Sequence, residues 1–161
     1  MAYEIDFVGH PNVKDDYDAI CFRFWDESKN KFINCVFDGG FSDCGIALYE
    51  HIKNYYSDLS GNFSIDYVFC YHGDQDHAAV LKYILENCEV KKLIVNFPWD
   101  YCDDLFPLVY DGRITKNSLQ QRLKEKYPYL VALEEVASKK GVEIVPGLTT
   151  SVIHPKLKII S

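Results

Sequence analysis

The segment Ile65-Asp66-Tyr67-Val68-Phe69-Cys70-Tyr71-His72-Gly73-Asp74-Gln75-Asp76-His77 changes character halfway along its length. Its first seven residues are mostly β-branched or aromatic, which is typical of a buried strand. The next six residues hold two histidines and two aspartates, and after them Ala78–Cys88 shows apolar residues at helical spacing. The sequence therefore predicts a strand, a polar strand-end loop and a helix in direct succession.

The strand-end loop carries side chains that suit a metal ion. Zinc and similar cations prefer imidazole nitrogen and carboxylate oxygen, and a strand-end loop can point alternate side chains into one pocket. His72 and Asp74 lie two residues apart, so we expect them to face one ion, and we expect Asp76 and His77 to face a second. Two neighbouring ions can activate a shared water for attack. A polar turn that binds no metal is the alternative interpretation.

The rest of the chain predicts further strands and helices around this segment. Turn residues and alternating or apolar runs predict strands at 3–8, 19–25, 32–37, 93–95, 142–145 and 151–160. Helices are expected after a cap at Ser42 or Asp43, over 118–126 and over 130–140, with Gly141 closing the last one. Between them, 96–112 is an aromatic and acidic excursion. Strands interleaved with helices indicate one layered α/β domain over residues 1–161.

Charge and cysteine usage narrow the class of protein. The net charge of −7 disfavours binding to a phosphate backbone, and the lysines of 116–140 are interspersed with glutamates, as on a solvated helix face. Six cysteines stand at irregular spacing without a Cys-x-x-Cys pair. The N-terminus does not resemble a secretory signal, and no apolar run approaches the roughly 18 residues of a membrane span. We therefore expect a cytoplasmic protein with free thiols and no membrane partner.

The loop at 72–77 resembles the metallo-β-lactamase signature His-x-His-x-Asp-His, which also follows a strand and opens a helix. With aspartate at position 74, it is most similar to the hydrolase domain of the competence DNA-uptake protein ComEC and its soluble relatives. Asp38-Gly39-Gly40 matches the Asp-Gly-Gly turn of that family, and 151–155 resembles the short Leu-His-Pro strand of the ComEC type.

The resemblance implies a fold and a division of roles. The fold is the αββα sandwich, in which two sheets are packed between helices. His72 and Asp74 would bind one metal ion and Asp76 and His77 the other, with Asp76 also assisting the attacking water as a catalytic residue. Asp38 would support the metal site from behind the ligands. The cofactors implied are up to two divalent ions, zinc first, with manganese or iron as alternatives.

Two departures from the family pattern change the expectation. Ala78-Ala79 stands where the family has glycines, and alanine still permits close helix packing. The family's later ligands, a bridging aspartate and a further histidine, have no counterpart, because His154 is the one histidine after His77. The resemblance therefore implies the N-terminal half of the sandwich, or a truncated version, incomplete towards the C-terminus. Three explanations are open: the chain is a fragment of a larger protein, a partner chain or a second copy completes the fold, or the half-domain has been repurposed. The apolar strand at 157–160, with nothing beyond it to pair with, favours the fragment.

The function expected from this resemblance is hydrolysis by a metal-activated water. The substrate class is a phosphodiester, either a small molecule or a nucleic acid, although the same fold also hosts acyl and thioester hydrolysis. The alternative is a non-catalytic metal-binding or scaffold protein, or one half of a split site that a partner completes.

Four other residues are candidates for weaker roles. His10 lies in a turn and either lines the site or is a surface residue, and His51 is expected to face solvent from a helix. His154 is a structural residue or a ligand from the far side. The loop around Trp99 either shapes a substrate pocket or forms a satellite hydrophobic cluster.

Overall fold

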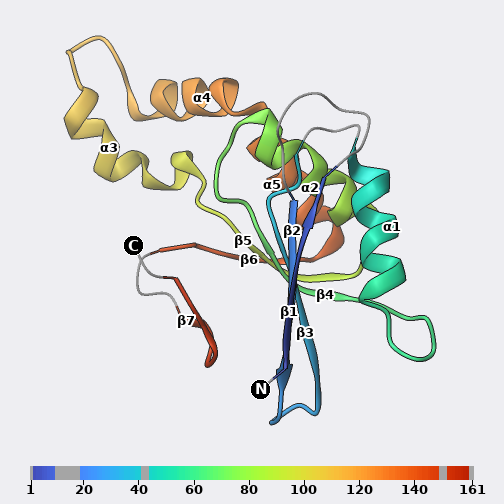
Figure 1. Ribbon diagram of the computed structural model, residues 1–161. Coiled ribbons are helices and arrows are strands. Elements are labelled where there is room, and N and C mark those ends of the chain that lie inside the picture. The colour runs from blue at the N-terminus through green and yellow to red at the C-terminus, as the bar shows by residue number, and fades with distance from the viewer. Residues whose placement is uncertain (1, 10–18, 41–43, 149–151, 160–161) are drawn as a thin grey trace.

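The computed structural model describes residues 2–9, 19–40, 44–148 and 152–159. It contains one six-stranded sheet, a two-stranded hairpin and helices (Figure 1). The sheet strands are β1 (Tyr3–Val8), β2 (Ala19–Asp26), β3 (Lys31–Phe37), β4 (Ile65–Phe69), β5 (Val90–Ile94) and β6 (Glu143–Val145). The helices are α1 (Gly45–Tyr55), α2 (Gln75–Asn87), η2 (Pro98–Tyr101), α3 (Cys102–Val109), α4 (Lys116–Lys126) and α5 (Pro128–Lys140). The mixed α/β class expected from the sequence is confirmed.

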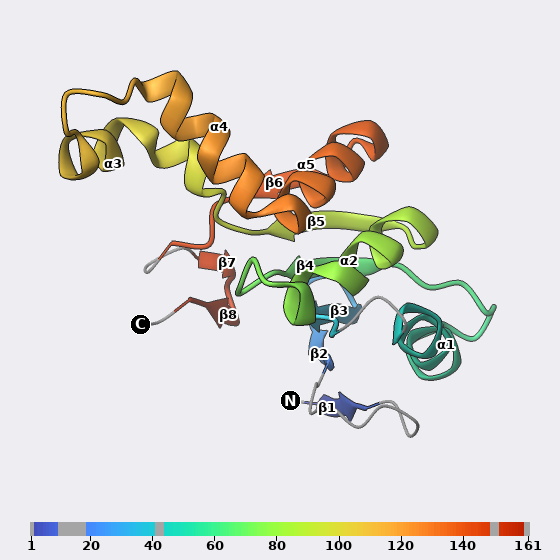
Figure 2. The ribbon, with the colours of Figure 1, turned by 90° about the horizontal axis from the view of Figure 1, so that it is seen from above.

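The order of the strands explains where the helices lie. The sheet runs β1-β2-β3-β4-β5-β6, with β1, β2 and β3 antiparallel and β3 to β6 parallel (Figure 2). The parallel strands succeed one another in a single direction, and each crossover between parallel strands is expected to be right-handed. When successive crossover connections have the same handedness and each leads to the next strand in the same direction across the sheet, their helices lie on the same face of the sheet. α1, α2 and α5 accordingly pack together on the same face of the sheet.

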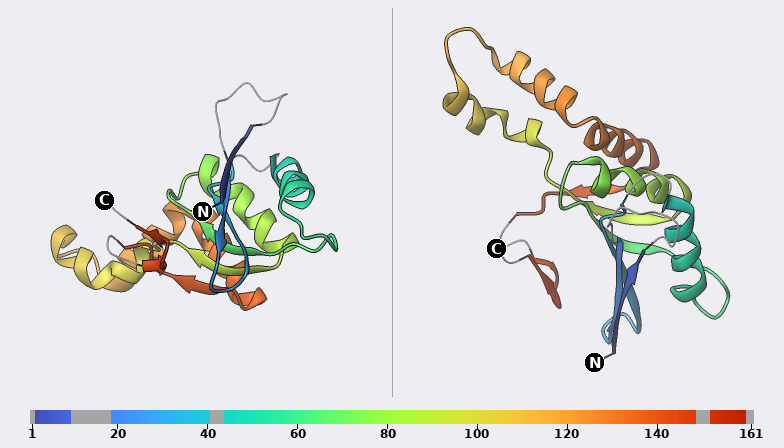
Figure 3. Two further views of the ribbon diagram at one scale, coloured as in Figure 1. Left: turned by 60° about the horizontal axis from the view of Figure 1, so that its bottom comes forward. Right: turned by 45° about the horizontal axis from the view of Figure 1, so that its top comes forward.

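The main core lies between those helices and the sheet. Residues of the sheet at alternate positions, such as Val36, Val68 and Leu93, are buried against Leu81 and Leu133 of the helices. α5 begins with Pro128 in its first turn and ends at Gly141, whose φ of 70° is left-handed. Both ends follow ordinary helix chemistry, so the predicted helix and its closing glycine are confirmed. α3 and the start of α4 extend away from the sheet (Figure 3).

The opposite face of the sheet is also apolar, but the segment that packs on it is smaller than the group of helices on the first face. The hairpin of β7 (Val152–His154) and β8 (Leu157–Lys158) packs there, with Ile153, Leu157 and Ile159 against a second buried cluster. That cluster comprises Phe24, Ile33, Cys35, Tyr67, Phe69 and Ile94. The sequence predicted one strand over 151–160, whereas the described residues of this segment form two short strands, β7 and β8, that pair with each other.

Strand β1 has its apolar residues on the less covered face. A strand of alternating polarity ordinarily turns its apolar side chains to the core. Here Tyr3, Ile5 and Phe7 are 73%, 53% and 70% exposed, whereas Glu4 and Asp6 are half-buried on the helix side. Asp6 accepts hydrogen bonds from His51 and Tyr56, and Glu4 pairs with Arg23. Polar contacts thus hold β1 on the helix side and leave apolar side chains uncovered on the other.

Several boundaries differ from those expected. α2 starts at Gln75 rather than Ala78, so Asp76 and His77 belong to its first turn. β5 starts at Val90 rather than Leu93, and the excursion at 96–112 contains η2 and α3. The six cysteines are free, as expected. The cap at Ser42 or Asp43 and the turn at His10 lie outside the described residues. Among the helices that the structure describes, none has both the length and the apolar character to cross a membrane.

Candidate functional site

The four candidate metal ligands lie at the carboxyl edge of the parallel strands. β3 ends at Phe37 and continues into Asp38, while β4 ends at Phe69 and continues into the loop 72–77. β3 and β4 are parallel neighbours, with Phe37 opposite Phe69, so both polar segments emerge side by side. In open α/β sheets, ligands commonly bind beyond this edge.

Asp38 holds the loop in place through both of its carboxylate oxygens. Oδ1 accepts a hydrogen bond of 2.9 Å from the Tyr71 amide, and Oδ2 lies 3.0 Å from Nδ1 of His77. The Asp38 backbone has a φ of 48°, in the left-handed region that non-glycine residues rarely adopt. Such backbone conformations persist where the surroundings impose them, and they cluster at functional sites. The aspartate expected behind the ligands therefore contacts one of them directly.

Two glycines allow the loop and its neighbour to approach the helices. A Cβ at Gly39 would lie 2.7 Å from Cβ of Val80 on α2, and one at Gly73 would lie 2.9 Å from Leu130 on α5. The Gly39 amide also donates to the carbonyl of His77 at 3.0 Å. Side chains at either position would displace the turn or the loop from α2 and α5. The glycines therefore fix the position of the candidate ligands against the core.

His77 is oriented so that one ring nitrogen remains for a ligand. A carboxylate only accepts hydrogen bonds, so Nδ1 of His77 carries the proton that it shares with Asp38. Nε2 lies on the other side of the ring, 3.5 Å from Oδ2 of Asp76. Metal-binding histidines characteristically donate their other ring N–H to a carboxylate, which fixes the tautomer and raises the basicity of the ligand nitrogen.

His72 lies on the opposite side of the same small cluster. Its Nδ1 is 3.2 Å from Oδ2 of Asp74, and its ring centroid is 5.6 Å from that of His77. Asp74 occupies the N-cap position of α2 but makes no capping hydrogen bond with its side chain, which faces His72 instead. The exposed fractions of the four side chains range from 37% for His77 to 62% for Asp74. They are accessible to an ion from solvent.

The donor set suits a divalent ion of the zinc class, with two imidazoles and two carboxylates. In the part of the chain that the structure describes, however, no three histidine, cysteine, aspartate or glutamate side chains are arranged around one position as a ready ion cage. His72 and Asp74 pair with each other, so an ion there would have to replace that contact. In the other half of the cluster, His77 lies between the carboxylates of Asp38 and Asp76.

Cys70, directly before the loop, is not part of the donor set. Its Sγ donates to the carbonyl of His72 at 3.1 Å, and burial, with a smaller effect of the Asp38 charge, raises the pKa of the thiol well above its ordinary range. The thiol is therefore protonated at neutral pH and serves packing. This agrees with the expectation that the cysteines are small buried hydrophobes.

His154 and His51, the other two histidines that the structure describes, lie away from the loop. His154 is buried, with Nε2 3.0 Å from Oδ2 of Asp26 and Nδ1 accepting from the Lys156 amide at 3.1 Å. Asp26 ends β2, at the edge of the sheet opposite the loop. His154 is therefore structural and not a ligand from the far side. His51 does not face solvent freely, because it packs on β1 and lies 3.1 Å from Asp6.

The Trp99 loop is a hydrophobic cluster. Trp99 is buried, stacks on Phe97 with ring centroids 5.0 Å apart, and donates from Nε1 to Glu134 at 3.1 Å. Of the two interpretations left open by the sequence, the structure supports the packing one for this side chain.

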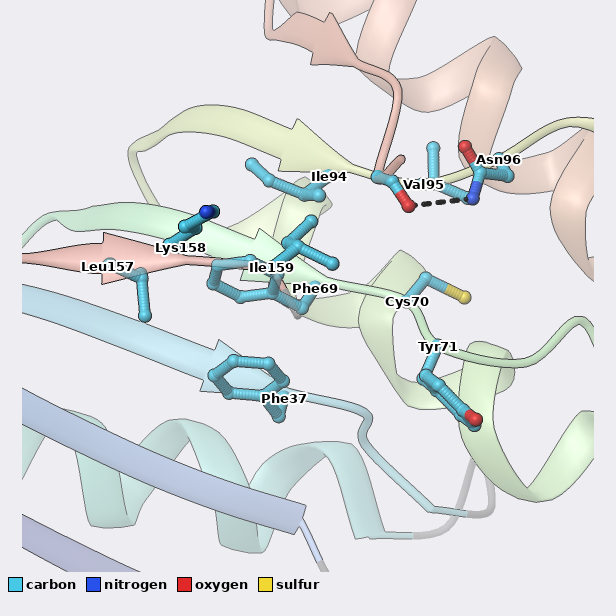
Figure 4. Close-up of a pocket in the computed structure, with 11 residues that line it drawn as sticks. Phe37, Phe69, Cys70, Tyr71, Ile94, Val95, Asn96, Leu157, Lys158 and Ile159 are labelled. Atoms are coloured by element: carbon cyan, nitrogen blue, oxygen red, sulfur yellow. Dashed lines mark hydrogen bonds between the residues drawn. The ribbon is translucent and has the colours of Figure 1, made fainter. Parts of the chain in front are cut away.

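A cavity that the sequence did not reveal adjoins the loop. It has a volume of about 360 Å³ and lies between the less covered sheet face and the β7–β8 hairpin (Figure 4). Phe37, directly before Asp38, and Phe69 to Tyr71, directly before His72, contribute to its walls. The signal available in the sequence was the unbroken apolar run at the end of each strand, Cys35-Val36-Phe37 in β3 and Tyr67-Val68-Phe69 in β4, since strands covered on both faces read as continuous apolar runs.

In comparisons with known proteins, no protein-family model and no curated protein matches the chain.

Proposed function

We propose that the protein is a metal-dependent hydrolase of the metallo-β-lactamase type that acts on phosphodiesters. The observation that carries the proposal is the contact between Asp38, directly after β3, and His77, in the first turn of the helix α2 that follows β4. It prepares one ring nitrogen of His77 for a ligand, as described for metal-binding histidines. The signature-like spacing of His72, Asp74, Asp76 and His77 adds the chemical types of the other donors.

The fold part of this proposal draws on the two faces of the sheet. Helices cover one face, as in one half of an αββα sandwich. On the other face Tyr3, Ile5 and Phe7 are exposed, although apolar patches of this kind usually mark contact surfaces. A second sheet supplied by a partner chain or by a second copy would bury them and bring further ligands to the loop.

The roles of the residues follow from their positions. His72 and Asp74 would hold one divalent ion, and His77 and Asp76 a second, with zinc preferred by the donor types. A bound ion of this class would supply Lewis acidity and a nucleophilic water at neutral pH. Asp76 lies in the first turn of α2, where the helix dipole favours its negative charge, and is half-exposed. Its carboxylate would accept a proton from the attacking water.

A hydrolysis assay tests the proposal. Protein purified without chelator is supplied with Zn²⁺ or Mn²⁺ and bis(4-nitrophenyl) phosphate, and release of nitrophenolate is followed. We expect turnover that falls at least about 100-fold in His77→Ala and Asp76→Asn, the loss typical of a removed acid–base or ligand group. Asp104→Asn, an exposed carboxylate on α3, is the matched control and should keep full activity. Equal rates in all four proteins would contradict the assignment.

A non-catalytic metal-binding or scaffold role is the second candidate. It is favoured by the lack, within the described ranges, of any three suitable donors around one position. Binding of metal to the wild-type chain without turnover of phosphodiester, acyl or thioester substrates would select this candidate.

A further inference from the structure

The cavity beside the loop is lined mainly by apolar side chains from four different strands. Phe37 comes from β3, Phe69 from β4 and Ile94 from β5, while Leu157 of β8 and the following Ile159 close it from the hairpin side (Figure 4). Phe37 and Phe69 are stacked, with ring centroids 4.0 Å apart and planes inclined by 3°. The stack covers the facing surfaces of the two rings and leaves their apolar edges and outer faces for an occupant, and aromatic groups pack favourably edge-to-face or offset against such rings.

The size of the cavity limits the occupant. Its volume of about 360 Å³ lies near the lower end of the range of roughly 300–1,000 Å³ that is usual for small-molecule sites. A dry apolar cavity of about 150 Å³ is enough for benzene. One aromatic ring with a short chain therefore fits, whereas a large polycyclic ligand or a nucleic-acid strand does not.

The polar groups in the lining differ in availability. Asn96 is occupied, because its Nδ2 donates to the Gly147 carbonyl at 3.0 Å and its Oδ1 accepts from the Tyr101 hydroxyl at 3.2 Å. Lys158 is the charged residue of the lining. It stands between Leu157 and Ile159, which pack towards the sheet, so its exposed side chain lies at the outer rim of the cavity, and no ion pair between it and an acid is present among the described residues. An available ammonium beside an apolar cavity complements a ligand that carries a negative charge.

We propose that this cavity binds a compact aromatic anion, with the ring against Phe37 and Phe69 and the charged end towards Lys158. The inference goes beyond the proposed hydrolysis and does not depend on metal, since none of these three residues is a candidate ligand. The cavity nevertheless opens next to the cluster, because Phe37 precedes Asp38 and Tyr71 precedes His72.

The test compares three probes on the full-length protein after chelator treatment, so that a metal ion cannot hold the anion. The probes are 4-phenylbutyrate, uncharged 4-phenylbutanol, and butyrate without the ring. Binding is followed by two-dimensional ¹H–¹⁵N NMR, which reports the affinity and the amides that shift. We expect saturable binding of 4-phenylbutyrate with shifts at Phe69, Ile94 and Leu157. Removing the ring should weaken binding more than about tenfold, given the value of burying an aromatic side chain.

Three variants separate the charge from the shape of the cavity. Lys158→Met should weaken 4-phenylbutyrate about two- to fivefold, the range of an exposed ion pair, and leave 4-phenylbutanol unchanged. Lys139→Met removes an exposed lysine of α5 and should change neither probe. Ile159→Trp should fill the cavity and abolish binding of both, with a circular dichroism melt confirming that the variant folds. Failure of 4-phenylbutyrate to saturate, or unchanged binding in a folded Ile159→Trp, would overturn the inference. Neither result depends on hydrolysis.

Discussion

Replacing Asp38 tests how the candidate site is held together. Asp38→Ala removes the acceptor for His77 and for the Tyr71 amide and leaves a Cβ at a φ of 48°. Asp38→Gly removes the same acceptors but tolerates that backbone conformation. The pair of variants therefore separates the hydrogen bonds from the backbone strain.

The structure gives the expected size of the effect. The charge-assisted bond to His77 is half-buried and should contribute about 1.5–3 kcal/mol, whereas the amide of the exposed Tyr71 can turn to water at little cost. Asp38 already has this left-handed backbone, but aspartate adopts it several-fold more readily than most residues, so the exchange for alanine adds up to about 1 kcal/mol. We expect Asp38→Ala to lower the free energy of unfolding by about 3 kcal/mol and Asp38→Gly by about 2 kcal/mol. For a chain of this length, the former corresponds to a fall in Tm of roughly 6–12 °C.

The assay is urea unfolding followed by circular dichroism, with metal content measured on the same preparations. Asn30 offers a matched control, because it has a φ of 50° in the turn between β2 and β3, far from the loop. Asn30→Ala should show only the backbone effect of about 1 kcal/mol and leave metal content unchanged. If Asp38→Ala were no more destabilising than Asn30→Ala and kept its metal, the proposed role of Asp38 would be wrong.

Three further predictions concern the fold around the site. The pKa of Asp26 is depressed, first by the hydrogen bond from Ser28 and then by that from His154, so the contribution of its carboxylate to stability is complete above about pH 4 and is lost as pH falls below that value. The difference in unfolding free energy between wild type and Asp26→Asn should therefore shrink towards pH 2.5. A difference that does not change with pH would refute this. Gly39→Ala should destabilise by about 2 kcal/mol through overpacking against Val80, with partial recovery in the Gly39→Ala/Val80→Ala double variant measured by the same unfolding curves. Phe7→Ser should change the free energy of unfolding by less than about 0.5 kcal/mol, because the ring is 70% exposed. The same variant should reduce self-association measured by sedimentation velocity. A large loss of stability would show that the ring is covered.

The helices and strands were predictable where local pattern and burial agree. The strand at Ile65 to Phe69 and the helix ending at Gly141 follow directly from apolar composition and from the chemistry of helix ends. The start of α2 was placed too late, because the acidic and histidine residues of 74–77 were interpreted as loop. Aspartate is favoured at an N-cap and in a first helical turn, so those residues extend the helix instead.

Other features depend on partners that lie far away in the sequence. The orientation of β1 is decided by His51 and Tyr56, which pair with Asp6 from some 45 to 50 residues away. No periodicity within β1 contains that information. The cavity likewise requires the register that sets Phe37 beside Phe69, together with the return of the hairpin carrying Ile159. The candidate ligands could be predicted from their spacing, whereas the contact of His77 with Asp38 required the parallel pairing of β3 with β4.

The most direct test of the central claim is the metal content of protein purified without chelator, measured by elemental analysis for the wild type and for His72→Ala/Asp76→Ala. Both residues are half-exposed, so the double variant should fold and retain the wild-type melt. The account predicts near-stoichiometric zinc, manganese or iron in the wild type and its loss in the variant. Equal metal content in the two proteins, or a wild type that stays metal-free even after incubation with excess Zn²⁺, would contradict it.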